Sequence, residues 1–400
     1  MNPFLAARVG RIKASPTLAV TAKAAELRRA GRDIIGLGAG EPDFDTPEHI
    51  KQAAIDAIRN GFTKYTAVDG ILELREALSD KFRRDNDIDY PADQILVSTG
   101  GKQSLFNAFE AILNPGDEVI VPAPYWVSYP DMVLLCDGEP VIVSAGPDQG
   151  FKLRPDQLRR VINDKTRAFV LNSPSNPTGA AYTRAELRAL ADVLLDHPRV
   201  IIITDDMYEH IYWGEEPFCS LLTVAPELYE RTITVNGVSK AYAMTGWRIG
   251  YAGGPKPIIA AMRKIQSQST SNPCGIAQKA ALAAISGDQN CVTEMCAAFR
   301  QRHDYLVAAL NRLPGFSCLA GAGTFYAFPD VSKAIAGLDG ISGDVQFSEM
   351  LLEKAEVAVV PGSAFGAPGH VRLSFACGLD TLERAVQRIA AVLPASSDAA

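Results

Sequence analysis

From about residue 93 onward the chain alternates short apolar runs with longer amphipathic stretches, and this alternation constrains its fold more than any other feature. Each run is continuously apolar, which is typical of parallel strands that are covered on both faces. Helices that cross between successive strands supply such covers, so the pattern predicts a three-layer α/β/α architecture. The runs are Ile95 to Val97, Val119 to Val121, Val141 to Val143, Phe169 to Leu171, Val200 to Ile203, Ile233 to Val235 and Ile249 to Ala252.

Two helix starts are also visible in the sequence. Thr183 is followed three residues later by Glu186, which is the spacing of a capping box. Thr46 precedes Pro47, so we expect a threonine cap ahead of a proline in the first turn.

The last hundred residues follow a different pattern. They contain a helical region at 293–313, short strand candidates at Phe325 to Phe328 and Val357 to Val360, and a closing helix from about Thr381. This pattern predicts a smaller α+β domain. At 400 residues the chain has room for two or three packed units. The expected division is an N-terminal segment at 1–45 that packs with the small domain, a large domain at 46–292 and the small domain at 293–400.

Composition narrows the function classes. The chain has 39 basic and 46 acidic residues, a net charge of -7, which argues against binding nucleic acid or an anionic membrane surface. No apolar run approaches the ~18 residues of a membrane span. Seven scattered cysteines indicate a reducing cytoplasm, and the spacing of Cys291 and Cys296 places them on different helix faces. We therefore expect a cytoplasmic protein without a metal site.

Several partial matches to common functional motifs lack the neighbouring residues that those motifs require. Gly38-Ala39-Gly40 starts like a dinucleotide fingerprint, but Asp43 replaces the third glycine and Pro42 would break the required helix. Gly101-Lys102 lacks the upstream glycine of a P-loop. The sequence contains neither His-Glu-x-x-His nor Gly-x-Ser-x-Gly, so zinc proteases and serine hydrolases lose their usual markers.

Polar residues at the carboxyl ends of three expected strands remain, at the sheet edge where open α/β folds bind ligands. Asp205 and Asp206 end one strand, Lys240 and Arg248 follow the next, and the turn-rich segment 172–179 follows a third. Taken singly, each also fits a plainer role as a turn cap, a surface lysine or an ordinary loop.

Together these segments resemble the fold-type I pyridoxal-phosphate aminotransferases. The matching motifs are Ser-Asn-Pro-Thr-Gly with Asn176, Asp-Asp-Met-Tyr with Asp205 and Tyr208, and Ser-Lys-Ala-Tyr-Ala-Met-Thr-Gly-Trp-Arg with Lys240 and Arg248. The likeness extends from Gly38 to Ser374, and its nearest form is the bacterial class I aspartate aminotransferases, especially the subgroup that also transaminates prephenate. It implies the pyridoxal-phosphate-dependent transferase fold, with a mostly parallel seven-stranded sheet.

The resemblance assigns roles in catalysis. Lys240 would bind the cofactor covalently and then carry a proton to and from the substrate α-carbon. Asp205 would keep the cofactor's ring nitrogen protonated. Tyr208 and Asn176 would hydrogen-bond the ring oxygen, and Trp126 would stack on the ring.

The resemblance also indicates which residues would bind the cofactor's phosphate and which would contact a second subunit. Gly100, Gly101 and Lys102 open a helix whose backbone amides would bind the phosphate, and Arg248 would add charged hydrogen bonds. Tyr65 matches a residue that reaches the neighbouring subunit's phosphate, which implies a homodimer. An ordinary packed aromatic is the alternative for Tyr65.

Substrate recognition follows from the same likeness. Arg372 would bind the α-carboxylate in a bidentate pair, with Gly40, Trp126 and Asn176 beside it. The distal carboxylate would meet Lys102 and an N-terminal segment that includes Lys13, Ser15 and Thr17. Solvated surface lysines are the alternative for Lys13 and Lys102.

The expected activity is a ping-pong exchange of the amino group between aspartate or glutamate and a 2-oxo acid, with prephenate as a further acceptor. An aminotransferase or lyase of the same fold that prefers aromatic or other neutral amino acids is the nearest alternative. A cofactor-binding regulator without turnover is disfavoured, because both Lys240 and Arg372 are present.

Overall fold

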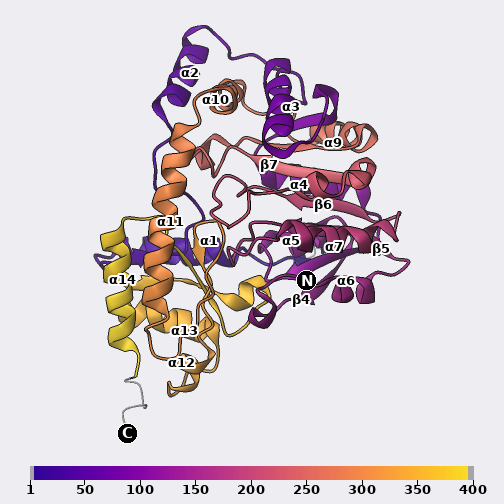
Figure 1. Ribbon diagram of the computed structural model, residues 1–400. Helices are drawn as coiled ribbons and strands as arrows, with labels where there is room; N and C mark the ends of the chain where they lie inside the picture. Colours follow the sequence, from indigo (N-terminus) through magenta and orange to yellow (C-terminus); the bar gives the residue numbers. More distant parts are fainter. Residues whose placement is uncertain (1–3, 395–400) are drawn as a thin grey trace.

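The computed structural model describes residues 4–394 (Figure 1). Its largest sheet has seven strands in the order β2-β8-β7-β6-β5-β3-β4. This confirms the α/β fold with a mostly parallel seven-stranded sheet. Each apolar run of the sequence forms one of the strands. Their bounds are β2 Ile95–Ser98, β3 Glu118–Ala123, β4 Glu139–Ser144, β5 Thr166–Asn172, β6 Ile201–Asp205, β7 Thr232–Gly237 and β8 Gly250–Gly253.

Within the described residues, β8 is the one strand of this sheet that runs against the others, because it pairs antiparallel with both β7 and β2. The reason is the connection from β7. Gly237 at the end of β7 pairs with Gly250 at the start of β8, so the chain turns back at the same sheet edge without a crossover helix. This turn carries Lys240 and Arg248.

Strand side chains point alternately to two apolar clusters, one on each face of the sheet. On β3, Val119 and Val121 join one cluster with side chains of α4, α5 and α9. Ile120 joins the other with side chains of α3, α7 and α10. The bounds of the helices around the sheet are α2 Glu48–Arg59, α3 Leu72–Asn86, α4 Gly101–Ile112, α5 Ser128–Leu135, α6 Pro155–Val161, α7 Arg184–Leu195, α8 Leu221–Val224, α9 Lys256–Ser269 and α10 Gly275–Ser286.

A third apolar cluster lies outside the large sheet and contains residues from both ends of the chain. A three-stranded sheet, β11-β12-β9, lies in this part of the molecule, and β1 pairs parallel with β10 in a separate ladder. The bounds here are α1 Pro16–Arg29, β1 Ile35–Gly36, α11 Asn290–Leu310, β9 Tyr326–Ala327, α12 Ser332–Ala336, α13 Asp344–Met350, β10 Val357–Ala358, β11 Val360–Pro361, β12 Val371–Ser374 and α14 Leu379–Val392.

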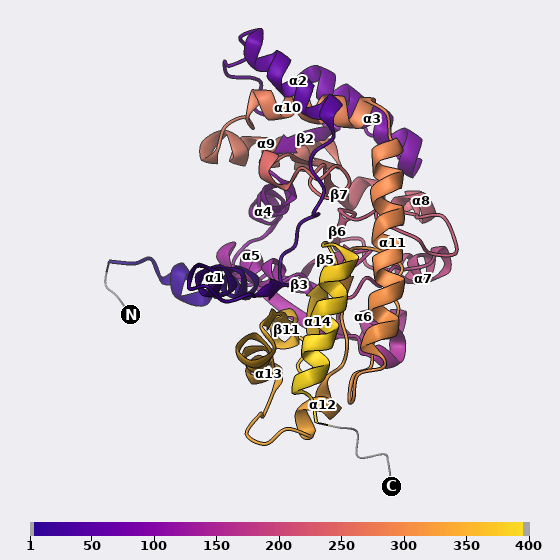
Figure 2. The ribbon, with the colours of Figure 1, turned by 90° about the vertical axis from the view of Figure 1, so that its left-hand side faces the viewer.

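The strand expected at Val357 to Val360 is divided into β10 and β11, because its two halves pair with different strands. β10 pairs with β1 and β11 pairs with β12. The long α11 runs from the region of α10 to lie beside α14 (Figure 2). The domain boundaries themselves stay a prediction.

One expected cap is confirmed and the other is wrong. Thr183 and Glu186 bond reciprocally at the start of α7, as a capping box requires. The cap residue of α2 is Pro47, which has no side-chain cap bond. The Thr46 hydroxyl is turned away from α2 and donates to the carbonyl oxygen of Ala243 at 2.7 Å.

Across residues 4–394, no helix has both the length and the apolar character needed to cross a bilayer.

Candidate active site

A cavity of about 350 Å³ lies where the carboxyl edge of the large sheet meets β9 and β12. Residues that are far apart in the sequence line it together. Of the side chains and glycines singled out in the sequence, it is lined by Ser15, Thr17, Gly40, Gly101, Lys102, Trp126, Asn176, Asp205, Tyr208, Lys240, Arg248 and Arg372.

Three of the sequence-predicted residues lie outside this lining. Gly100 directly precedes α4 and packs against Arg248. Lys13 lines an adjoining cavity of about 560 Å³, which shares Lys102 with the first. Tyr65 is 91% exposed and does not line the cavity.

Lys240 places an amine in the cavity. It lies on the turn between β7 and β8, and its Nζ donates to the Gly40 carbonyl oxygen at 2.6 Å. Burial and the nearby Arg248 lower the pKa of this amine to about 8. The neutral form of Lys240, which can act as a nucleophile or a base, is therefore far more populated near neutral pH than that of an ordinary lysine.

Asp205 places a carboxylate at the end of β6. Its side chain accepts hydrogen bonds from the Tyr129 hydroxyl at 2.6 Å and from the Met207 backbone at 3.3 Å. Burial raises the pKa of Asp205, and these two donors oppose that shift. The sequence analysis did not identify Tyr129, because nothing in its local pattern separates it from an ordinary core aromatic.

Asp206 has different surroundings, although it is adjacent in the chain. It is buried beside Ser220 and Glu209 and does not line the cavity. Burial, together with the Glu209 carboxylate, raises the pKa of Asp206 to about 8. The structure therefore directs Asp205, and not Asp206, to the cavity.

Arg372 places a guanidinium on β12 with only 2% of its surface exposed. Its Nη1 donates to the Asn176 side chain at 2.9 Å and its Nη2 to the Gly38 carbonyl oxygen at 2.8 Å. Among the described residues its Nε has no hydrogen-bond partner, and no carboxylate forms an ion pair with it. A buried cation left in this state is a binding site for an anion.

The turn before α4 forms a second place for an anion. Gly100 has a φ of +86°, and a side chain there would collide with the Arg248 guanidinium. Gly250 packs so closely on Gly101 that a Cβ at Gly250 would overlap the backbone. Bare backbone at a helix N-terminus beside an arginine suits a phosphate group, so these residues fit a phosphorylated cofactor.

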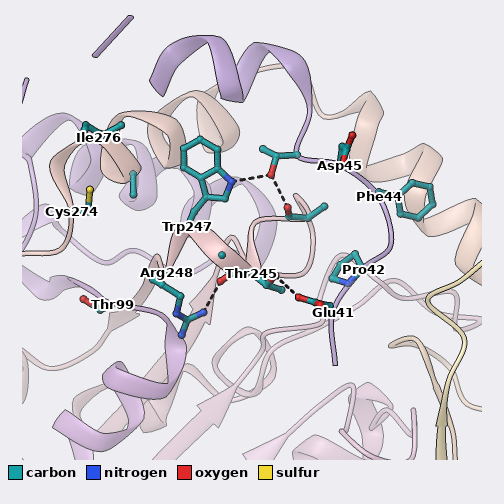
Figure 3. Close-up of a pocket in the computed structure, with 14 residues that line it drawn as sticks. Glu41, Pro42, Phe44, Asp45, Thr99, Thr245, Trp247, Arg248, Cys274 and Ile276 are labelled. Atoms are coloured by element: carbon teal, nitrogen blue, oxygen red, sulfur yellow. Dashed lines mark hydrogen bonds between the residues drawn. The ribbon is translucent and has the colours of Figure 1, made fainter. Parts of the chain in front are cut away.

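Arg248 also lines a second, wider cleft of about 780 Å³ (Figure 3). Its own Nη1 donates to the Thr245 carbonyl oxygen at 2.8 Å, and its backbone has a φ of +56°. In the same cleft the Trp247 Nε1 donates to the Thr46 hydroxyl at 2.9 Å. These bonds hold the β7–β8 turn, and thereby Arg248, against the segment that follows Gly40.

The sequence matches the family described as "Aminotransferase class I and II" over residues 32–389. It is 58% identical to an aspartate/prephenate aminotransferase of Nitrosomonas europaea, covering 97% of this chain and 99% of the relative. It is 56% identical to the corresponding protein of Cereibacter sphaeroides, covering 97% and 98%.

Solved structures give the same result. The fold matches an aspartate aminotransferase from Rhizobium meliloti with a TM-score of 0.94 and 49% identity, covering 98% of this chain and 99% of that one. It matches an aspartate aminotransferase from Thermus thermophilus with maleate at a TM-score of 0.92 and 48% identity, covering 97% and 99%. The chain therefore belongs to the class I and II aminotransferase family.

Proposed function

We propose that this protein is a pyridoxal-phosphate-dependent aminotransferase that exchanges the amino group between aspartate or glutamate and a 2-oxo acid by a ping-pong mechanism, with prephenate as a further acceptor. One observation carries the proposal. A half-buried amine (Lys240), a buried carboxylate (Asp205) and a buried guanidinium that has no carboxylate partner among residues 4–394 (Arg372) line one small cavity.

Different residues of the cavity would bind different parts of the cofactor. Lys240 would hold it covalently, and Gly100, Gly101 and Arg248 would bind its phosphate. When bound, pyridoxal phosphate supplies a ring that withdraws electrons from the substrate α-carbon. The Asp205 carboxylate would hold a proton on the ring nitrogen, and Tyr129 keeps that carboxylate in place.

Other residues bind and activate the substrate. Arg372 would bind the α-carboxylate, for which its Nε is free within the described structure. Lys240, once released from the cofactor, would remove the α-proton and deliver it to the C4′ carbon of the cofactor. Trp126 lines the cavity, and the Lys102 Nζ lies 4.9 Å from the centroid of its ring. The acidic side chain of a substrate beside this ring would therefore meet the Lys102 cation.

The relatives support acidic substrates. Those cited above are named for aspartate, two also for prephenate, and one was solved with maleate, a four-carbon dicarboxylate. We infer the same substrate class here. The seven cysteines, all within the described residues, are free thiols, which fits a cytoplasmic location.

We also infer a homodimer with shared sites. Tyr65 is 91% exposed, and Ile58 and Leu72 nearby in the sequence are 54% and 52% exposed. Large apolar side chains left exposed in this way would be covered by contact with a second subunit. Tyr65 of one subunit would then reach the phosphate bound by the other.

The test is a half-reaction followed by absorbance. Protein loaded with pyridoxal phosphate should absorb visible light, and aspartate or glutamate should abolish that absorbance while releasing one keto acid per site. Adding 2-oxoglutarate or prephenate should restore it. Phenylalanine and arogenate serve as competing donors in the same assay.

A Lys240→Ala variant should still bind the cofactor through its phosphate and ring, but turnover should fall by several orders of magnitude. Lys256→Ala, at an exposed ion pair with Asp93, is the matched control. Faster reaction with phenylalanine than with aspartate would favour the neutral-substrate alternative, and continuous keto-acid release without an acceptor would favour a lyase.

A further inference from the structure

Tyr326, which the sequence analysis did not identify, lines the cavity from the small sheet. It begins β9, is 1% exposed, and pairs with Ser374 of β12, the strand that carries Arg372. The Arg372 guanidinium carbon lies 4.3 Å from the centroid of its ring. The ring therefore packs under the guanidinium that we assign to the substrate carboxylate.

The hydroxyl of Tyr326 contacts the loop that follows β6 of the large sheet. It lies 3.0 Å from the Tyr208 hydroxyl, within hydrogen-bond distance, and both residues line the cavity. It also packs against Gly40, where a Cβ would lie 2.8 Å from its oxygen. The Gly40 carbonyl oxygen accepts the hydrogen bond from Lys240. Tyr326 thus contacts three elements of the proposed site.

Each of the two phenols has a single proton, so only one of them donates in their shared hydrogen bond. Burial raises the pKa of both hydroxyls, so both are protonated at neutral pH. The charged groups around them are Arg372, Asp205 and Glu41. Arg372 lowers the pKa of both hydroxyls, while Glu41 raises the pKa of Tyr326 and Asp205 raises that of Tyr208. The Arg372 guanidinium packs on the Tyr326 ring itself, which favours Tyr326 as the donor.

We propose that Tyr326 is a positioning residue of the reaction: its hydroxyl donates to the Tyr208 oxygen and leaves the Tyr208 proton free to hydrogen-bond the cofactor's ring oxygen. This inference rests on the proposed function, since it needs the cofactor in the cavity. It assigns Tyr326 a role through Tyr208 and no direct part in proton transfer at the substrate.

The geometry explains why a tyrosine is useful at this position. A phenylalanine would keep the ring under Arg372 but would leave Tyr208 without its donor. Tyr208 would then be free to rotate or to donate elsewhere, and its bond to the ring oxygen would weaken. The hydroxyl also links β9 to the loop after β6, so the part of the molecule that carries Arg372 helps to set the orientation of Tyr208.

The experiment titrates the visible absorbance of the protein loaded with pyridoxal phosphate. Tyr208 would lower the pKa of that chromophore by donating to the ring oxygen, so Tyr208→Phe should raise it. Tyr326→Phe should raise it by about 0.5 to 1 unit, which corresponds to the loss of one neutral hydrogen bond. Tyr90→Phe is the matched control, because Tyr90 is another buried tyrosine, bonded to Thr234 outside the cavity, and its loss should leave the titration unchanged.

A double variant separates positioning from a general structural effect. If Tyr326 acts through Tyr208, then Tyr326→Phe should add no further shift in the Tyr208→Phe background. An additive shift, or no shift in Tyr326→Phe alone, overturns the inference while the proposed function stands. If the unaltered protein shows no chromophore that responds to aspartate, the proposed function falls and this inference falls with it.

Discussion

At the residue scale, Asp205 and Asp206 are neighbours with opposite environments. Asp205 lines the cavity and bonds to Tyr129, whereas Asp206 is buried beside Ser220. We predict that Asp205→Ala slows exchange of the substrate α-proton by at least about a hundredfold, since a charged contact of ~3 kcal/mol is lost. Asp206→Ala should change this rate much less. Proton exchange followed by NMR measures both, and a greater loss in Asp206→Ala would contradict the assignment.

Lys240 gives a prediction about pH. Its pKa of about 8 means that the amine loses its proton as the pH rises through 8, and only the neutral amine attacks a carbonyl carbon. The rate of capture of pyridoxal phosphate by the cofactor-free protein should therefore rise with pH and level off above about 8. Stopped-flow absorbance measures it. With free Nα-acetyl-lysine as the control, the rise should continue to about 10.4.

Lys102 and Lys13 give a prediction about the preference for acidic substrates. Lys102 borders both the main cavity and the adjoining one, while Lys13 borders only the latter, where its backbone donates to Asp131 at 3.3 Å. Lys102→Ala and Lys13→Ala should each lower kcat/KM for aspartate and prephenate by about tenfold to a hundredfold, the value of one charged hydrogen bond. The value for phenylalanine should change little. Equal losses on acidic and neutral substrates would place the lysines in folding or cofactor binding.

At the scale of elements, a buried ion pair joins α3 to the loop that follows β6. Lys81 is fully buried and pairs with Glu209, which also accepts hydrogen bonds from Asn86 and Asn236 at 2.7 Å each. Burial alone would raise the pKa of Glu209, but Lys81 and His210 lower it to about 2. Glu209, which directly follows Tyr208 in the sequence, is therefore a buried negative charge that depends on Lys81 for its stabilisation.

We predict that Lys81→Met destabilises the protein by about 3–5 kcal/mol, because it leaves a buried carboxylate without a cation. The double variant Lys81→Met/Glu209→Gln should lose less than the two single variants together. Urea unfolding monitored by circular dichroism measures these values. Arg160→Ala, which breaks an exposed ion pair with Asp156 on α6, is the control and should cost below about 0.5 kcal/mol. A similar small cost for Lys81→Met would show that the pair is dispensable.

At the scale of the whole molecule, we predict a particle of twice the chain mass of 42.9 kDa. Light scattering at micromolar concentration measures it. Tyr65→Phe should leave that mass unchanged but weaken the binding of pyridoxal phosphate by roughly fivefold to tenfold, the value of one hydrogen bond. A single-chain particle with full activity would contradict the shared site.

Most of the large sheet could be predicted from sequence because its strands are continuous apolar runs between amphipathic helices. The antiparallel direction of β8 could not be predicted, since an apolar run such as Ile249 to Ala252 looks the same whether its strand runs parallel or antiparallel to its neighbours. The cap at Thr183 was predictable because both of its partners lie within one helical turn. The supposed cap at Thr46 was wrong because Ala243 and Trp247, about 200 residues away, engage its hydroxyl.

The sequence by itself determined where the strands lie along the chain, the family motifs and the residues that end each strand, since these depend on neighbours a few positions apart. Tertiary structure decided which of these groups share one cavity and what surrounds them. Tyr129 reaches Asp205 over 76 positions, and Tyr326 reaches Tyr208 over 118. No local pattern marks such partners, because a buried tyrosine has the same apolar ring whether its hydroxyl meets a catalytic group or the protein interior. Only the packing of the two parts of the chain around the cavity gives those hydroxyls their chemistry.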